Sequence, residues 1–160
     1  MRKFSIFLIL IFILTNSAWA APKPGDQAPK FSLVSMEGKT VSLDDLKGKI
    51  VLIGMFHICV PCMNQAMEFE KVKAAVNSDN LVVLGINTNG DSKEGVEKYL
   101  SGFPSPISFT YLLDPEMSVQ KAYIQRDMPT ILIIDQKGEI KARSPSVGAD
   151  QLVSYIKKLL

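Results

Sequence analysis

The sequence contains few of the side chains that build metal sites and no basic segment suited to nucleic acid. Its 160 residues include one histidine, His57, and two cysteines, Cys59 and Cys62. A closed structural zinc site needs four protein ligands, so these three residues cannot complete one. Lysine and arginine do not cluster with aromatic residues, which gives no support for nucleic-acid binding. We therefore expect no metal, no other cofactor and no nucleic-acid partner.

Charge and hydropathy set the first 20 residues apart from the rest. Arg2 and Lys3 precede an almost wholly apolar stretch, residues 4–14, and Ala18-Trp19-Ala20 has the small-x-small pattern of a signal-peptidase site. The apolar stretch is too short for a bilayer-spanning helix, which needs about 20 residues. We predict a cleaved secretory signal peptide over residues 1–20. An uncleaved N-terminal anchor is the alternative.

The remaining chain, residues 21–160, is long enough for one domain with a hydrophobic core. Its net charge is zero, because Arg2 and Lys3 account for the excess of 18 basic over 16 acidic residues in the whole chain. The overall charge of +2 therefore does not indicate an anionic partner. The signal predicts an exported protein, periplasmic or otherwise extracytoplasmic, with no membrane span after cleavage.

Hydrophobic periodicity predicts a single α/β domain. Continuous apolar runs predict buried strands at 50–56 and 81–87, and the segment between them repeats apolar or small residues at helical spacing: Cys62, Ala66, Phe69, Val72 and Val76. A strand, a helix and a strand in this order imply a right-handed crossover and a parallel pair. Shorter patterns predict an extended lead-in at 21–30, strands at 31–34, 39–43, 110–113, 130–135 and 139–143, a helical turn at 42–46, and helices at 92–100, 116–123 and 149–160. We expect a mixed central sheet between helices.

Two residues, Val60 and Pro61, separate Cys59 from Cys62. A disulfide across so short a loop would stabilise the fold little, because cross-links that close long loops restrict the unfolded chain most. The pair lies where strand 50–56 has ended and the helix begins, and the free N–H groups of a helix N-terminus favour a thiolate. We predict that Cys59 is the exposed attacking thiolate. Cys62, one helical turn further on, is expected to be the shielded thiol that resolves the mixed disulfide.

The sequence resembles the TlpA/ResA-like branch of the thioredoxin superfamily over residues 28–160. The segments that carry the resemblance are 28–33, 38–43, 46–49, the Cys59–Cys62 pair, and Met128-Pro129-Thr130 with 133–138. The resemblance implies a thioredoxin-like fold with an N-terminal β extension. It also implies an enzyme that reduces, oxidises or relays protein disulfides outside the cytoplasm, often in cytochrome c maturation.

The resemblance also assigns roles to the residues around Pro129. In this family the proline that matches Pro129 is cis and packs beside the cysteine pair, and the residue that matches Met128 presents its backbone to an extended substrate segment. Met128, Pro129 and Thr130 are therefore the expected substrate-binding residues. The expected partners are proteins that carry thiols or disulfides and a membrane thiol electron donor. We favour a reductant because of this resemblance; a proline before the second cysteine occurs in reducing members but does not decide the direction.

Three positions depart from the family pattern. Ile58 stands where many relatives have tryptophan, Ile53 where thioredoxins have a buried aspartate, and Gln65 where ResA-type relatives have glutamate. Both missing acids are associated with the proton of the buried thiol. Their replacement places the usual proton path in question, but not the disulfide exchange.

His57 lies two residues before Cys59. As an imidazolium it would stabilise the thiolate, or it would move protons in place of the missing acids. The alternative is a solvated loop residue at the rim of the site.

A peroxiredoxin is the main enzymatic alternative, because peroxiredoxins share the fold and a similar N-terminal segment. Their peroxidatic cysteine needs Thr or Ser three residues earlier to orient the peroxide. Here that position holds Phe56 before Cys59 and Cys59 before Cys62, so neither cysteine fits. Copper chaperones of the Sco type also resemble the fold, but they have a wider cysteine spacing and a distal histidine that are missing here.

A low-turnover binding module is an alternative of a different class. Such a thioredoxin-like domain would bind unfolded chains through the edge formed by Met128 and Pro129. Four apolar residues near the cysteine pair would add to that surface: Met55, Phe56, Ile58 and Val60. The intact cysteine pair argues against this alternative, because non-covalent binding of an unfolded chain needs no thiol exchange.

Overall fold

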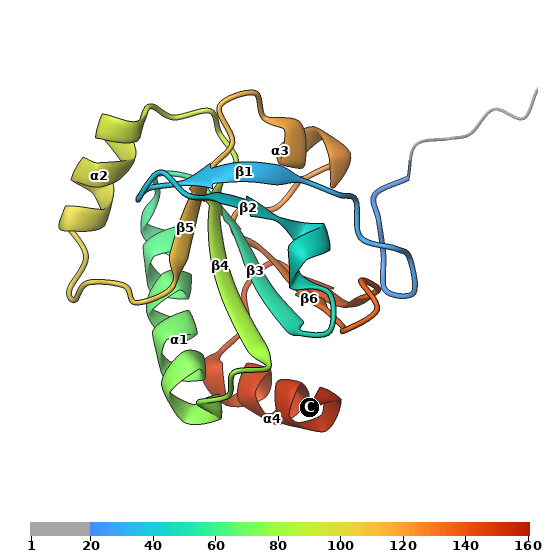
Figure 1. The fold of residues 1–160 in the computed structure, drawn as a ribbon. Coiled ribbons are helices and arrows are strands. Elements are labelled where there is room, and N and C mark those ends of the chain that lie inside the picture. The colour runs from blue at the N-terminus through green and yellow to red at the C-terminus, as the bar shows by residue number, and fades with distance from the viewer. Residues whose placement is uncertain (1–19) are drawn as a thin grey trace, which may run out of the picture.

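The computed structural model describes residues 20–160, which form a seven-stranded mixed sheet flanked by four helices (Figure 1). The strand order is β2-β1-β5-β4-β3-β6-β7. The predicted α/β class and mixed sheet are therefore confirmed. The predicted signal peptide lies outside the described residues, apart from Ala20 at its end. Within residues 20–160, no helix is both long and apolar enough to cross a bilayer.

The centre of the sheet is built from the two apolar runs of the sequence. Strands β3 (Ile50–Phe56) and β4 (Leu81–Asn87) pair in parallel along their whole length, from Ile50 opposite Leu81 to Phe56 opposite Asn87. All seven residues of β3 are buried, because the strand has neighbours on both sides and helices over the sheet. Helix α1 (Val60–Val76) makes the predicted crossover between them.

Antiparallel strands extend the sheet in both directions. On one side, β6 (Thr130–Ile134) pairs with β3 and forms a hairpin with β7 (Ile140–Ser144), whose turn has Gly138 at φ +83°. On the other side, β5 (Thr110–Leu113) is parallel to β4. The predicted N-terminal extension is β1 (Ser32–Ser35) and β2 (Thr40–Ser42), and β1 pairs antiparallel with β5.

The remaining helices begin and end close to their predicted bounds. Helix α2 (Lys93–Ser101) is capped by Ser92, α4 (Ala149–Leu159) closes the chain, and a 3₁₀ turn, η1, spans Leu43–Leu46. Helix α3 (Ser118–Ala122) is shorter than the predicted 116–123. It starts late because Met117 has a left-handed backbone, φ +52°, and the carboxylate of Asp114 accepts the first N–H groups of the helix.

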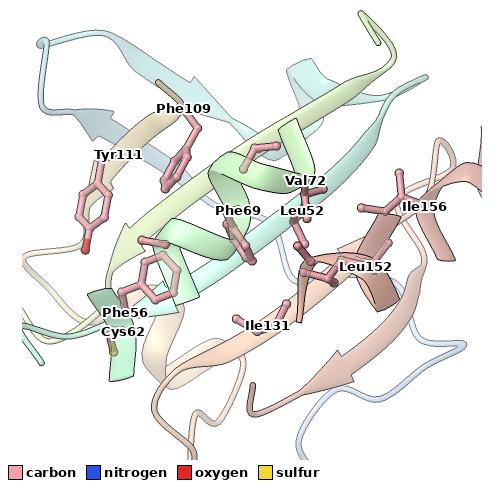
Figure 2. Packing of buried hydrophobic residues seen from close by; sticks show 14 of the residues in the cluster. Leu52, Phe56, Cys62, Phe69, Val72, Phe109, Tyr111, Ile131, Leu152 and Ile156 are labelled. Atoms are coloured by element: carbon pink, nitrogen blue, oxygen red, sulfur yellow. The ribbon is translucent and has the colours of Figure 1, made fainter. Parts of the chain in front are cut away.

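Two layers of side chains cover the sheet, one on each face. Alternate residues of β3 belong to different layers. Leu52 and Phe56 pack with α1 and α4 (Figure 2), in a layer that also includes α2, while Val51 and Met55 pack with α3 and η1. Gly54 leaves room for the Phe56 ring, since a Cβ atom there would lie 2.1 Å from Cζ of Phe56. The carboxyl ends of β3 and β4 are thereby fixed against α1.

Candidate active site

Strand β3 ends three residues before Cys59, which lies at the start of helix α1. Cys59 is the N-cap residue, with an extended backbone, and its Sγ accepts a hydrogen bond of 3.3 Å from the backbone N–H of Cys62. Pro61 occupies the first turn, where a helical residue needs no N–H donor. The local sequence therefore folds so that the first sulfur faces the free N–H groups at the helix start.

The two sulfur atoms lie 2.6 Å apart, and both cysteines are free. Cys59 is half-buried, whereas Cys62 is 0% exposed. Burial and the neighbouring Cys59 thiol raise the pKa of Cys62 to about 12, although the backbone N–H of His57, 3.3 Å from its Sγ, acts in the opposite direction. Cys62 is therefore a protonated thiol at neutral pH, and it is shielded from solvent, whereas Cys59 is accessible.

The segment before β6 lies at the same end of the sheet as the cysteine pair. The Met128–Pro129 peptide bond is cis, which confirms the conformation that the resemblance implied. Thr130 begins β6 opposite Met55, near the carboxyl end of β3, so the antiparallel pairing brings Pro129 to the edge from which Cys59 projects. Met128 is 53% exposed, and its role in binding stays a prediction.

Two polar residues that the sequence analysis missed hold this segment in place. Gln125 donates through Nε2 to the carbonyl oxygens of Met55, at 3.1 Å, and Asp127, at 3.2 Å. Thr88 donates to Oε1 of Gln125 at 2.6 Å. The position of Thr88 directly after a predicted strand was a usable signal, but no sequence pattern marks Gln125.

The positions of the two missing acids have other structural uses. Ile53 is buried in the apolar layer on the face opposite α1. Gln65 is 4% exposed and pairs with the backbone of Val147, to which it donates at 2.8 Å and from which it accepts at 3.0 Å. It thus joins α1 to the loop before α4, and neither side chain can exchange a proton with Cys62.

His57 is half-buried, and its Nε2 atom is buried without a hydrogen-bond partner. Burial lowers the pKa of His57, and the carboxylate of Asp91 opposes this shift. The imidazole is therefore neutral at neutral pH. Tyr99 of α2 reaches the same region and donates a hydrogen bond of 2.7 Å to the carbonyl oxygen of Cys59.

The apolar surface around Cys59 is smaller than predicted. Ile58 and Val60 are 44% and 63% exposed, and Met128 adds to them. Met55 and Phe56 were wrongly included, because both lie in the central strand β3 and are at most 1% exposed. Within residues 20–160, no three His, Cys, Asp or Glu side chains are grouped so that they could hold a metal ion.

Comparison with known proteins gives matches over most of the chain. The AhpC/TSA family matches residues 24–143. Thiol-disulfide oxidoreductase ResA of Halalkalibacterium halodurans is 26% identical over 139 residues, which are 86% of this chain and 77% of that protein. The provisionally named peroxiredoxin bcp of Coxiella burnetii is 31% identical over 149 residues, 82% of this chain and 94% of the relative.

Solved structures show the same fold. A solution structure from Bacteroides thetaiotaomicron, provisionally identified as a protein disulfide isomerase, superimposes with a TM-score of 0.78. It is 22% identical in sequence, and the match covers 87% of this chain and 91% of the other. This likeness concerns the fold alone.

Proposed function

This chain belongs to the AhpC/TSA family and is a TlpA/ResA-like thiol–disulfide oxidoreductase of the thioredoxin superfamily, and from this premise we propose that it is an exported reductant of protein disulfides. The proposed catalytic residues are Cys59 and Cys62. The proposed substrates are proteins that carry a disulfide, and the proposed electron donor is a membrane thiol protein.

The observation that carries the proposal is the arrangement of the two sulfurs, 2.6 Å apart with only Cys59 reachable from solvent. As a thiolate, Cys59 attacks one sulfur of the substrate disulfide, forms a mixed disulfide and releases the other substrate sulfur as a thiolate. Cys62 then gives up its proton and attacks Cys59. The second substrate sulfur leaves with its electron pair, so the substrate gains two electrons and the enzyme pair becomes a disulfide.

The segment at Met128 and Pro129 supports a role in substrate positioning. It lies at the end of the sheet where β3 leads to Cys59, and the side chains of Ile58, Val60 and Met128 are exposed. We propose that an extended substrate segment pairs with the Met128 backbone while its apolar side chains contact these three residues. Thr130 stabilises the conformation of this segment, since it is buried and its hydroxyl donates to the Asp127 carbonyl oxygen at 2.6 Å.

The export proposal rests on the sequence of residues 1–20, and it assigns residues 21–160 to the mature domain. A Cys-x-x-Cys-His segment of an apocytochrome c is the substrate we propose, because its two thiols must be reduced before haem attachment. Reduction of the oxidised form of such a peptide, compared with an unrelated disulfide peptide, tests this substrate class.

The equilibrium reduction potential of residues 21–160, measured against glutathione or dithiothreitol, tests the direction of transfer. A value near or below about −220 mV is expected for a reductant that receives its electrons from a donor. A value near about −120 mV would instead identify an oxidant of newly exported chains. Absence of any reversible dithiol–disulfide couple would leave the binding module as the better explanation.

Peroxide reduction is a second candidate function, and the similarity to the Coxiella burnetii relative favours it. The site offers less support, because the residue three positions before Cys59 is Phe56, which has no hydroxyl and is 1% exposed. Consumption of hydrogen peroxide with dithiothreitol as reductant distinguishes the two functions. Fast consumption that depends on Cys59 would favour the peroxidase.

A further inference from the structure

Two buried polar atoms near the cysteine pair lack a hydrogen-bond partner. They are Nε2 of His57 and the hydroxyl oxygen of Tyr111, and no other buried side-chain nitrogen or oxygen within residues 20–160 is in this condition. Tyr111 is 1% exposed. Burying a polar group without a partner destabilises a fold, so two such groups in one region need an explanation beyond packing.

Both groups lie close to the end of β3. Tyr111 is in β5, and its ring stacks against Phe56, the last residue of β3, with 6.2 Å between the centroids. Figure 2 shows its hydroxyl directed toward the end of the sheet where Phe56 and Cys62 lie. His57 follows Phe56 in the chain, and its backbone N–H contacts the sulfur of Cys62. One residue thus contacts the buried thiol through its backbone, and the other packs on the last residue of β3, three positions before Cys59.

The charges around the two atoms indicate one shared region. Burial raises the pKa of Tyr111 and lowers that of His57, and the carboxylate of Asp91, in the loop between β4 and α2, adds to the first shift and opposes the second. The other titratable groups that face Tyr111 are Tyr99 from α2, Cys62 from α1 and Cys59 at its cap, and each of them also raises its pKa. The elements around Tyr111 thus bring acidic groups and both thiols together.

We propose that His57 takes the proton of Cys62 when the mixed disulfide is resolved, through a water molecule held between His57 Nε2 and the Tyr111 hydroxyl. The inference rests on the proposed disulfide exchange and supplies the proton acceptor that Ile53 and Gln65 do not. A buried water needs two to four polar partners, and these two atoms are free to bond it. The neutral imidazole has a free ring nitrogen for the proton, and because burial lowers the pKa of His57, the imidazolium holds the proton only transiently.

The step balances with the groups present. The proton of Cys62 passes to the water, which gives a proton to Nε2 of His57. The Cys62 sulfur then forms a bond to Cys59, the bond from Cys59 to the substrate sulfur breaks, and that sulfur leaves with the electron pair. His57, which is half-buried, returns the proton to solvent. Tyr111 is a positioning residue in this scheme, because it donates to the water and does not change its own charge.

Stopped-flow reaction of the reduced protein with dithiobis(nitrobenzoate) separates the two thiols. Cys59 releases the first nitrothiobenzoate when it attacks the reagent, and Cys62 releases the second when it resolves the mixed disulfide. The experiment compares the wild type with His57→Gln and Tyr111→Phe across pH 5 to 9. Tyr123→Phe is the matched control, because its hydroxyl donates to the Pro29 carbonyl at 2.7 Å in the opposite layer.

The second phase should change while the first does not. In His57→Gln we expect it to slow by about tenfold or more and to gain a steady rise with pH, because general-base assistance is lost. In Tyr111→Phe we expect slowing by about three- to tenfold with the wild-type pH profile retained. The melting temperature of Tyr111→Phe should fall less than that of Tyr123→Phe, because the Tyr111 hydroxyl is proposed to bond a water and makes no hydrogen bond to the protein. Tyr123→Phe should melt earlier but keep both phases.

An unchanged second phase in either His57→Gln or Tyr111→Phe would overturn the proposal. So would a loss confined to the first phase in His57→Gln, which would show that the imidazole acts on Cys59 instead. A wild-type protein that releases only one nitrothiobenzoate would refute the proposed disulfide exchange itself. The experiment therefore separates failure of the proton path from failure of the function.

Discussion

Tyr99 donates its hydroxyl proton to the carbonyl oxygen of Cys59 across 2.7 Å. This hydrogen bond joins the middle of α2 to the residue that caps α1, although the two residues are 40 positions apart in the chain. The ring of Tyr99 is itself held edge-on by Phe103, with 4.9 Å between the centroids. The backbone of the attacking cysteine is therefore held by α2 as well as by its own helix.

We expect Tyr99→Phe to reduce the free energy of unfolding by about 1 kcal/mol, the usual net contribution of one hydrogen bond. The reactivity of Cys59 toward iodoacetamide should also change, because the cap residue loses a support. Urea denaturation and alkylation rates measure the two effects. Tyr155→Phe is the control: the hydroxyl of this exposed residue donates to the carbonyl oxygen of Lys141 at 3.0 Å, and its loss should leave the alkylation rate unchanged.

Cys62→Ala should accumulate covalent complexes with substrate proteins. The variant keeps the attacking thiol but lacks the thiol that resolves the mixed disulfide. Non-reducing gels of whole cells, repeated after dithiothreitol, would show bands that disappear on reduction. Cys59→Ala provides the matched control and should trap nothing. Equal recovery of partners by both variants, without a covalent link, would favour the binding module.

Titration of Cys62 should make the reduced protein less stable at high pH. Its pKa is about 12 in the fold against an ordinary 9.0, so the folded state holds the proton more tightly than the unfolded state. This stabilisation is complete below pH 9 and is lost as pH rises toward 12, by about 1 kcal/mol per pH unit. Urea denaturation between pH 8 and 10.5 measures it. The slope should be shallower in Cys62→Ala, and parallel slopes would contradict the assignment.

Gln65→Glu, which restores the acid of ResA-type relatives, should destabilise this protein. The amide of Gln65 gives one hydrogen bond to Val147 and receives another, and a carboxylate can only receive. We expect a loss of about 1–3 kcal/mol in the free energy of unfolding, because the carbonyl of Val147 loses its donor and a carboxylate is placed at the buried position of Gln65. Gln151→Glu, at an exposed position of α4, is the control and should have little effect. Unchanged stability in Gln65→Glu would show that the loop before α4 can rearrange.

The central elements of the fold could be predicted because burial imposes a simple pattern on them. A strand covered on both faces needs an unbroken apolar run, and the predicted bounds of β3 and β4 match the structure. The start of α3 could not be predicted in the same way. It depends on the carboxylate of Asp114 and the backbone of Met117, and no periodicity records either feature.

The candidate site likewise contains residues that the sequence predicts and residues that it does not. The spacing of Cys59 and Cys62, and their position between a strand and a helix, were visible in the sequence. Tyr99, Tyr111 and Gln125 were not, because each reaches the site from a distant segment that only the folded sheet brings near. The error over Phe56 has a related cause: closeness to Cys59 in the chain says nothing about which face of the strand a side chain occupies.

The pairing of β1 with β5 also protects the sheet from aggregation with the proteins that are its proposed substrates. Without the N-terminal strands, β5 would offer unpaired backbone groups along a segment rich in apolar residues, which is a template for aggregation with unfolded protein. The margin is instead β2, three residues long and partly exposed. So short a strand gives another chain little backbone to pair with at this edge of the sheet.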